Sequence, residues 1–228
     1  MNGSHYFQMT DQGRVRSHNE DFCFSCVPSE SVEFAQKGAL FIIADGLGGL
    51  ADGEIASKSA AEGVRNAFMS QDRFGGTSWL KDIIQHANQT IYQINRKRSP
   101  QNWMATTLTL SLFHSDHLYI GHVGDCRVYR VRGTQATCLT QDHTVDRHTL
   151  TRTVGIEPRV SVDTPQSRVL PGDVFLQCSD GLYSMVTEAE LRRIVTSLEP
   201  AQACGRLIAM ANERGGPDNI TLQVVRIP

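Results

Sequence analysis

Three apolar runs in the sequence each end at an aspartate with a glycine beside it, and a fourth run begins after an Asp-Asn pair. Strand ends are places where a fold can hold side chains rigidly while leaving them exposed. Four such carboxylates, drawn from distant parts of the chain, predict a metal cage that only the folded chain assembles. The pairs are residues 40–44 with Asp45, 118–123 with Asp125, 174–179 with Asp180, and 220–225 with Asp218.

The length of the chain fits one domain. Single hydrophobic cores grow to roughly 250 residues before chains split, and we expect residues 1–228 to form one unit. The 22 basic and 24 acidic residues are well mixed, so there is no electrostatic footprint for nucleic acid or an anionic membrane. No apolar stretch approaches the ~18 residues of a membrane span, and the N-terminus does not read as a signal peptide. We expect no membrane span and a cytoplasmic protein.

The cysteines and two of the histidines do not indicate a site. The six cysteines lack the regular spacing of a disulfide scaffold, which favours reduced thiols. Cys23 and Cys26 form a CxxC, but within an expected strand they point to opposite faces. His114 and His117 flank an expected hairpin turn, so we interpret them as surface neighbours of that turn.

Four segments have helical periodicity, at residues 54–69, 79–94, 191–195 and 203–211. The apolar stripe of the first includes Ile55. Short β-branched or aromatic runs bounded by turn residues predict strands at residues 22–27, 40–44, 107–113, 118–123, 128–131, 174–178 and 220–225.

The order of these elements favours an α+β layered domain. Long helices are segregated from the strands, so they would cover the outer faces of sheets that pack on each other. A hairpin turn at Ser115-Asp116 and the lack of a helix between residues 118–123 and 128–131 both oppose regular βαβ alternation.

The carboxylates themselves indicate a hard metal ion. Asp-Gly alone is weak evidence, because both residues are common in turns, but here it recurs at strand ends, and Glu20-Asp21 opens another run. Gathered carboxylates repel one another unless a cation joins them. All the candidate ligands are oxygen donors, which favours Mg²⁺ or Mn²⁺ over Zn²⁺. Two such ions sharing a carboxylate can activate a water and stabilise charge on a phosphoryl group.

Six separated motifs, taken in order, give the sequence a family resemblance. It resembles the bacterial metal-dependent serine/threonine protein phosphatases of type 2C, over residues 10–225. The motifs are Thr10-Asp11-Gln12-Gly13 through Arg16 to Asn19-Glu20-Asp21, then Ala44-Asp45-Gly46-Leu47-Gly48-Gly49, Thr106-Thr107, His122-Val123-Gly124-Asp125-Cys126-Arg127, Ser179-Asp180-Gly181 and Asp218-Asn219.

The resemblance implies a single phosphatase domain with a four-layer αββα sandwich, two antiparallel sheets flanked by paired helices. It implies two Mn²⁺ or Mg²⁺ ions, with a weaker third in bacterial members, and attack on phosphate by a metal-bridging hydroxide. The residue roles that it implies are Asp45 as the bridge, Asp180 and Asp218 on the first ion, the Gly46 carbonyl with Glu20 and Asp21 on the second, Asp125 with Asp180 on the third, and Arg16 on the substrate phosphate.

The sequence departs from the family pattern in two places. Leu50 stands where many relatives carry a histidine proposed as general acid, so either another group supplies the proton or the enzyme is slower. The hypothesis is that a metal-bound water, or else His143 or His148, takes that role, with the water favoured. The flap subdomain of relatives is nearly absent, with only residues 144–149 in its place. A more open site is therefore expected, with broad acceptance of phosphopeptides and small aryl phosphates.

The leading hypothesis is a phosphatase for phosphoserine and phosphothreonine in proteins, acting on the products of a serine/threonine kinase. A catalytically silent regulatory module with the same fold is one alternative, although such modules tend to lose the metal carboxylates, which are all retained here. A binuclear-metal hydrolase of small phosphate esters is another.

Overall fold

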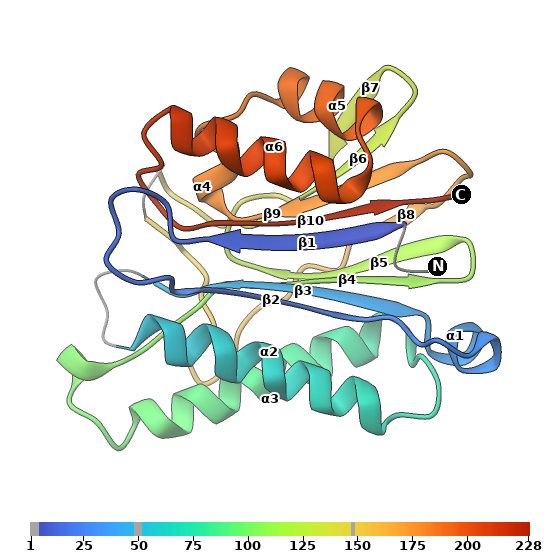
Figure 1. The fold of residues 1–228 in the computed structure, drawn as a ribbon. Helices are drawn as coiled ribbons and strands as arrows, with labels where there is room; N and C mark the ends of the chain where they lie inside the picture. Colours follow the sequence, from blue (N-terminus) through green and yellow to red (C-terminus); the bar gives the residue numbers. More distant parts are fainter. Residues whose placement is uncertain (1–4, 48–51, 147–148) are drawn as a thin grey trace.

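Two five-stranded antiparallel sheets pack face to face with helices on both outer sides (Figure 1). The computed structural model describes residues 5–47, 52–146 and 149–228. Sheet A has the order β1 (Tyr6–Asp11), β10 (Ile220–Arg226), β9 (Val174–Cys178), β6 (Arg127–Arg132) and β7 (Gln135–Cys138). Sheet B has the order β2 (Asp21–Cys26), β3 (Ala39–Asp45), β4 (Leu108–His114), β5 (His117–Val123) and β8 (Gln166–Arg168).

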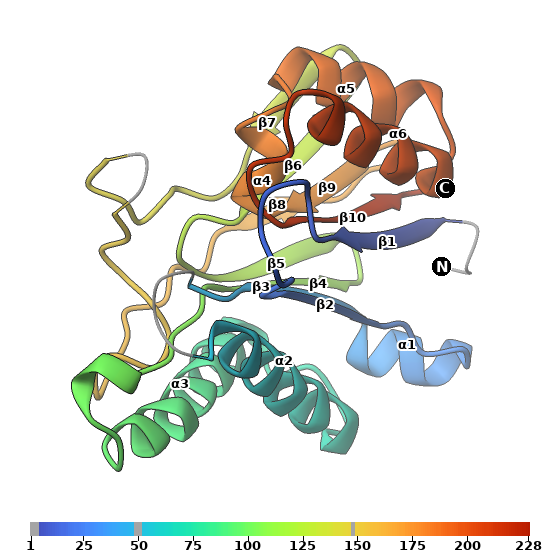
Figure 2. The same cartoon turned by 60° about the vertical axis from the view of Figure 1, so that its left-hand side comes forward.

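The helices form the two outer layers, so the predicted α+β four-layer sandwich with paired helices is confirmed (Figure 2). One pair covers sheet B and the other covers sheet A. The pair on sheet B is α2 (Gly53–Ser70) and α3 (Gly76–Asn95). The pair on sheet A is α5 (Glu188–Ser197) and α6 (Pro200–Glu213), and the short α4 (Asp180–Tyr183) precedes α5. The remaining helices are α1 (Ser31–Lys37) and the 3₁₀ turn η1 (Pro100–Asn102).

The central strands read as continuous apolar runs because both of their faces are buried. In β3, six consecutive residues from Ala39 to Ala44 are buried, with the other sheet on one side and helices on the other. Between the sheets, at one end, Phe113 packs edge-to-face against Phe41 and Phe175, with ring centroids 5.7 and 5.1 Å apart. We call Phe41, Phe113 and Phe175 the aromatic end.

Most of the elements that the sequence did not predict are peripheral, and the exception is the short α4 beside the cleft. Strands β1, β7 and β8 lie at sheet edges, and α1 buries no residue, so none of these has a strong apolar pattern. One detail of the predicted α2 stripe is wrong, since Ile55 is 46% exposed and lies on the outer side of the helix. The hairpin at Ser115-Asp116 is confirmed, with Ser115 in the left-handed region at φ 54°.

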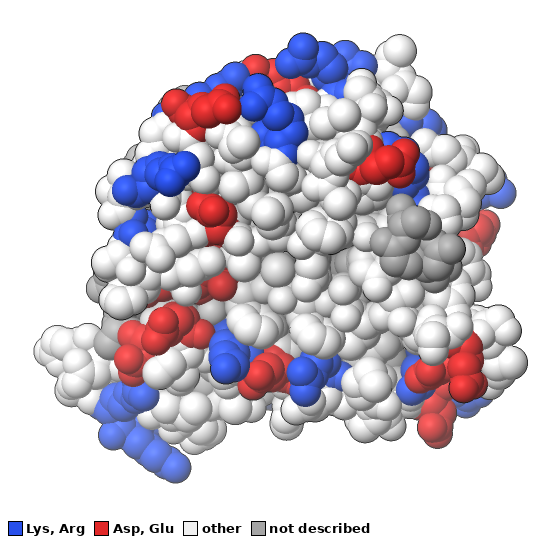
Figure 3. Space-filling view, in the orientation of Figure 1, with Lys and Arg blue, Asp and Glu red and all other residues white. Residues whose placement is uncertain are grey.

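Among the helices of the described residues, none is long and apolar enough to cross a bilayer. On the face seen in Figure 3, basic and acidic side chains are interspersed, in keeping with the formal net charge of −2. Binding of an anionic substrate must therefore depend on a local site.

Candidate metal centre

The strand ends that carry the predicted carboxylates meet at one end of the sandwich, on the left in Figure 1. Asp21 and Asp45 are directly opposite each other in the β2–β3 pair. Asp21 is 7% exposed, and its Oδ2 accepts a hydrogen bond of 2.7 Å from the Ser179 hydroxyl. Its Oδ1 is buried and has no hydrogen-bond partner. A buried carboxylate oxygen without a donor is a position that a cation would satisfy.

The backbone around Asp45 is held by the paired threonines. The Asp45 N–H donates to Thr107 Oγ1 at 3.0 Å, and the Thr106 hydroxyl donates to the Asp45 carbonyl at 2.8 Å. Gly46 follows, and its N–H donates to the Glu20 carbonyl at 3.0 Å. A side chain at Gly46 would collide with the backbone of Gly53 and Glu20, so only glycine allows this close approach.

Asp180 and Asp218 are brought together by the start of α4 and the turn before β10. A side chain at Gly181 would collide with the Asn219 backbone, which shows how closely the two segments approach. The Asp218 carboxylate forms an ion pair with Arg16, with 2.8 Å between Oδ2 and Nη2. The predicted phosphate-binding arginine therefore lies at the carboxylate cluster.

Asn219 has a structural role that the sequence pattern did not reveal. Its Oδ1 accepts from the Glu20 N–H, and its Nδ2 donates to the carbonyls of Gln12 and His18, each at 2.9 Å. One amide thus fastens the loop that carries Arg16 and Glu20 to the start of β10. The only sequence signal was the Asp-Asn pair, which also occurs in ordinary turns.

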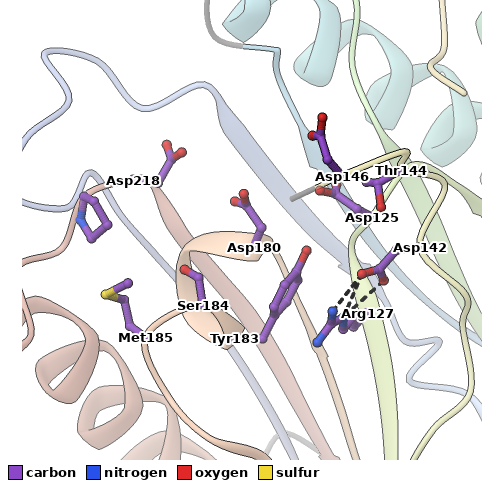
Figure 4. Close-up of a pocket in the computed structure, with 11 residues that line it drawn as sticks. Asp125, Arg127, Asp142, Thr144, Asp146, Asp180, Tyr183, Ser184, Met185 and Asp218 are labelled. Carbon is purple, nitrogen blue, oxygen red and sulfur yellow. Dashed lines mark hydrogen bonds and ion pairs between the residues drawn. The ribbon is translucent and has the colours of Figure 1, made fainter. Parts of the chain in front are cut away.

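A cleft of about 770 Å³ opens beside Asp125, Asp180 and Asp218 (Figure 4). On one side the Arg127 guanidinium lies 3.8 Å from the centre of the Tyr183 ring and pairs with Asp142. The cleft therefore has charged and aromatic groups around the carboxylates. Its lining residues are Asp125, Arg127, Asp142, Thr144, Asp146, Asp180, Tyr183, Ser184, Met185, Pro217 and Asp218.

The carboxylates hold protons more tightly than usual when no cation accompanies them. Burial and the charge of Asp142 raise the pKa of Asp125 to about 6, and burial with the charge of Asp125 raises the pKa of Asp180 to about 7. Burial and the charge of Asp21 raise the pKa of Asp45 well above its usual value. Mutual repulsion of this kind is relieved by a bound cation.

The donor set fits hard divalent ions, although the described side chains do not form a closed cage. In the described part of the chain, no three His, Cys, Asp or Glu side chains are gathered as a group that could hold a metal ion. Of the candidate carboxylates, Asp125, Asp180 and Asp218 line the cleft, and all the candidate groups would contribute oxygen. The orphaned oxygen of Asp21 and the raised pKa values of Asp21 and Asp45 mark positions where a cation would relieve unpaired negative charge, and oxygen donors suit hard ions.

Neither of the histidines predicted as proton donors is found in the cleft among the described residues. His143 is 5% exposed and does not line the cleft, and both ring nitrogens face protein groups, Nδ1 the Gly124 N–H and Nε2 Asp163. It is therefore badly placed to protonate a leaving group. His148 and Leu50, with Gly48 and Gly49, lie outside the described residues.

The two cysteines of the CxxC are free thiols, as expected.

Comparisons with known proteins agree with this arrangement. The family model described as Protein phosphatase 2C matches residues 13–211. The serine/threonine phosphatase stp of Listeria innocua is 31% identical over 240 residues, which cover 95% of this chain and 93% of that protein. The serine/threonine protein phosphatase PstP of Mycobacterium tuberculosis is 31% identical over 97% of this chain and 45% of its own length.

Solved structures show the same fold. The crystal structure of the M. tuberculosis phosphatase PstP/Ppp has a TM-score of 0.85 at 28% identity and covers 97% of both chains. The Staphylococcus aureus phosphatase Stp1 has a TM-score of 0.91 at 24% identity, over 100% of this chain and 96% of that one. The family match extends over most of the sequence, and the strand ends that carry its motif carboxylates lie at one end of the sandwich. The chain therefore belongs to the protein phosphatase 2C family of serine/threonine phosphatases.

Proposed function

We propose that the protein hydrolyses phosphoserine and phosphothreonine monoesters in proteins, with Mn²⁺ or Mg²⁺ as cofactor. The observation that carries this proposal is the group of buried carboxylates with raised pKa values at the edge of an open cleft, with Arg16 beside them. The substrates would be products of a serine/threonine kinase in the cytoplasm. Membership of the phosphatase family supports this reading.

The residues that would hold the cations are those at the converging strand ends. When bound, the two cations lower the pKa of a water and neutralise charge that builds on the phosphoryl group. The proposed ligands are Asp45 for both ions, Asp180 and Asp218 for one, Glu20, Asp21 and the Gly46 carbonyl for the other, and Asp125 with Asp180 for a third.

Arg16 is the proposed phosphate-binding residue. Its guanidinium presents planar N–H donors, which match two phosphate oxygens better than a lysine would. In the structure it pairs with Asp218 and remains 40% exposed. Because Asp218 is also a proposed cation ligand, Arg16 can exchange this carboxylate for the phosphate of a substrate. Glu20 and Asp45 add negative potential that keeps the guanidinium at the cluster.

The proton for the departing serine or threonine oxygen is proposed to come from water in the cleft. None of the described residues that line the cleft is a histidine. Tyr183 does line it, but burial and the charge of Asp125 raise the pKa of its hydroxyl, which makes it a weaker acid than usual. We therefore propose water in the cleft as the proton source.

The short segment in place of a flap supports broad substrate acceptance. Between Asp142 and Leu150 the described backbone forms a single bridge, from Thr144 to Leu150. One side of the cleft is thus not covered by a subdomain, and we propose that unrelated phosphopeptides and small aryl phosphates all enter. Strict selectivity among unrelated phosphopeptides would contradict this part of the proposal.

A phosphothreonine peptide assay tests the proposed function. We expect phosphate release with Mn²⁺, loss of release with excess chelator, and recovery when Mn²⁺ is restored. An Asp116→Asn variant, changed at an exposed hairpin turn, is a matched control that keeps full activity. Activity that survives chelation would overturn the metal mechanism, and no activity on any phosphomonoester with Mn²⁺ or Mg²⁺ would favour the silent-module alternative.

A further inference from the structure

Asp125 lies directly after a turn whose geometry depends on Gly124. This glycine has a φ of +111°, which other residues rarely adopt. A side chain on it would also collide with Thr107, so the turn lies directly against the residue that precedes β4. Nothing in this contact orients the Asp125 carboxylate, which must be held from elsewhere.

The dipeptide Asp142-His143 contacts the turn on both flanks of Asp125. The His143 N–H donates to the Gly124 carbonyl at 2.9 Å, and the Gly124 N–H donates to His143 Nδ1 at 3.1 Å. The Asp142 carboxylate accepts three hydrogen bonds from Arg127, at 2.7, 3.1 and 3.2 Å. Two consecutive residues therefore hold the positions before and after Asp125.

The His143 ring is itself fixed by its other nitrogen. Its Nδ1 accepts from the Gly124 backbone N–H, and its Nε2 lies 3.2 Å from Asp163 Oδ2 and 3.1 Å from Arg152 Nη1. Arg152 binds the second oxygen of Asp163 at 2.8 Å. The His122 ring packs 4.8 Å away, centroid to centroid. The Asp163–Arg152 ion pair thus holds the orientation of the imidazole from the side opposite Gly124, as outer partners do for ring ligands in many metal sites.

We propose that Asp142 and His143 form a clamp that positions the Asp125 carboxylate, and that His143 is a positioning residue and not a proton donor. The clamp fixes the Gly124 backbone before Asp125 and the Arg127 side chain after it, so it limits how far the Asp125 side chain moves relative to Asp180 across the cleft. The inference rests on the proposed role of Asp125 as a cation ligand, but the clamp itself exists without a cation and can be measured in the metal-free protein.

The first test measures the Gly124 hydrogen bond by amide hydrogen exchange in the metal-free protein. His143→Asn keeps an acceptor at the place of Nδ1, whereas His143→Leu and His143→Gln remove it. We expect the Gly124 amide to stay protected in His143→Asn and to exchange about tenfold faster or more in His143→Leu and His143→Gln. Equal protection in all variants would overturn the clamp. Should His143→Leu not fold, the Asn and Gln variants still decide the question.

The second test measures Mn²⁺ binding by electron paramagnetic resonance. Loss of an outer partner of a metal ligand typically lowers affinity by about 10–100-fold. We expect His143→Leu to weaken the lowest-affinity Mn²⁺ by about tenfold or more, while His143→Asn stays within about threefold of the wild type. His122→Asn is the matched control, since this ring is also buried but hydrogen-bonds Thr109 and the Gln141 carbonyl instead of Gly124.

The outcomes separate the clamp from the proposed function. Equal Mn²⁺ affinity in all His143 variants, or an equal loss in the Asn and Leu variants, would overturn the positioning role. A wild-type protein that binds no Mn²⁺ would instead overturn the proposed function, and the amide-exchange result would then decide the clamp by itself.

Discussion

The two ends of the space between the sheets differ in what they bury. At the aromatic end, Phe41, Phe113 and Phe175 are at most 4% exposed, and Phe113 packs edge-to-face against the other two rings. At the other end, Asp21 and Asp45 are packed side by side, and their pKa values are raised by burial and by the charges of neighbouring carboxylates. Aromatic burial stabilises the fold, whereas buried like charges destabilise it in the absence of a cation. The stability of regions such as the aromatic end thus offsets the cost of burying the carboxylates at the site.

The largest expected effect concerns activity at the carboxylate end. Replacing Asp45 with Asn removes the proposed shared ligand, and since bound cations contribute several kcal/mol to the transition state, kcat/KM should fall by at least about 10³-fold. Phosphate release from a phosphothreonine peptide at saturating Mn²⁺ is the measurement. The metal-free variant should be at least as stable as the wild type in urea unfolding. Retained activity would remove Asp45 from the centre of the mechanism.

At the aromatic end the opposite pattern is expected. Phe113→Ala leaves a cavity between Phe41 and Phe175, and such changes typically cost about 3 kcal/mol or more in the free energy of unfolding. The kcat/KM of the folded fraction should stay within about twofold of the wild type, because no proposed ligand contacts this ring. Urea denaturation and peptide turnover at low temperature measure the two quantities. A large loss of turnover would show that the two ends are coupled.

A pH effect sharpens the contrast. The folded-state pKa of Asp125 is raised from 3.8 to about 6, so the folded protein keeps a proton that the unfolded chain has lost over this range. With respect to this group, the free energy of unfolding therefore has its full value below about pH 4 and falls as the pH rises through 6. Asp125→Asn should stabilise the metal-free protein at pH 7.5 by about 2 kcal/mol, with the gain vanishing near pH 4.

The measurement for Asp125→Asn is urea unfolding at several pH values with chelator present. Asp173→Asn is the control with the reverse sign: burial alone would raise the pKa of Asp173, but Arg132 and the Leu170 N–H hold it below its usual value. That variant should be less stable than the wild type at pH 7.5. A pH-independent effect of Asp125→Asn would argue against the raised pKa.

The smallest expected effect concerns substrate binding at Arg16. Arg16→Lys keeps the charge but loses the planar pair of donors, so KM for a phosphopeptide should rise about tenfold with a smaller change in kcat. Steady-state kinetics with the peptide measures this split. Arg14→Lys, two residues away, is the matched control and should leave KM unchanged. Equal KM values for the wild type and Arg16→Lys would mean that the guanidinium does not bind the phosphate.

Much of the fold was predictable from local pattern. Strands such as β3 and helices such as α3 have strong apolar signals because they are buried on two faces or along one stripe. Strands β1, β7 and β8 were missed because edge strands of mixed composition lack that signal. Ile55 was misassigned because an apolar residue at helical spacing can still lie on the outer side of the helix.

The candidate site shows the same division. The carboxylates themselves and Arg16 were identifiable, since each belongs to a short local motif. Two features were not: the amide of Asn219, which fastens a loop 199 to 207 residues away in sequence, and the placement of His143 behind the cleft. A motif identifies the residue type at a position, but not which distant backbone group it contacts.

The amino-acid sequence alone determined the central strands and long helices, the family and the oxygen-donor chemistry, because periodicity and motif spacing are local properties of the chain. Only the tertiary structure decided that Asp21 faces Asp45, that Arg16 pairs with Asp218, and that His143 accepts a hydrogen bond from the Gly124 N–H before Asp125. These contacts join segments far apart in sequence, and packing and burial select them. The same burial raises the carboxylate pKa values and so makes the strand ends a site that favours a cation.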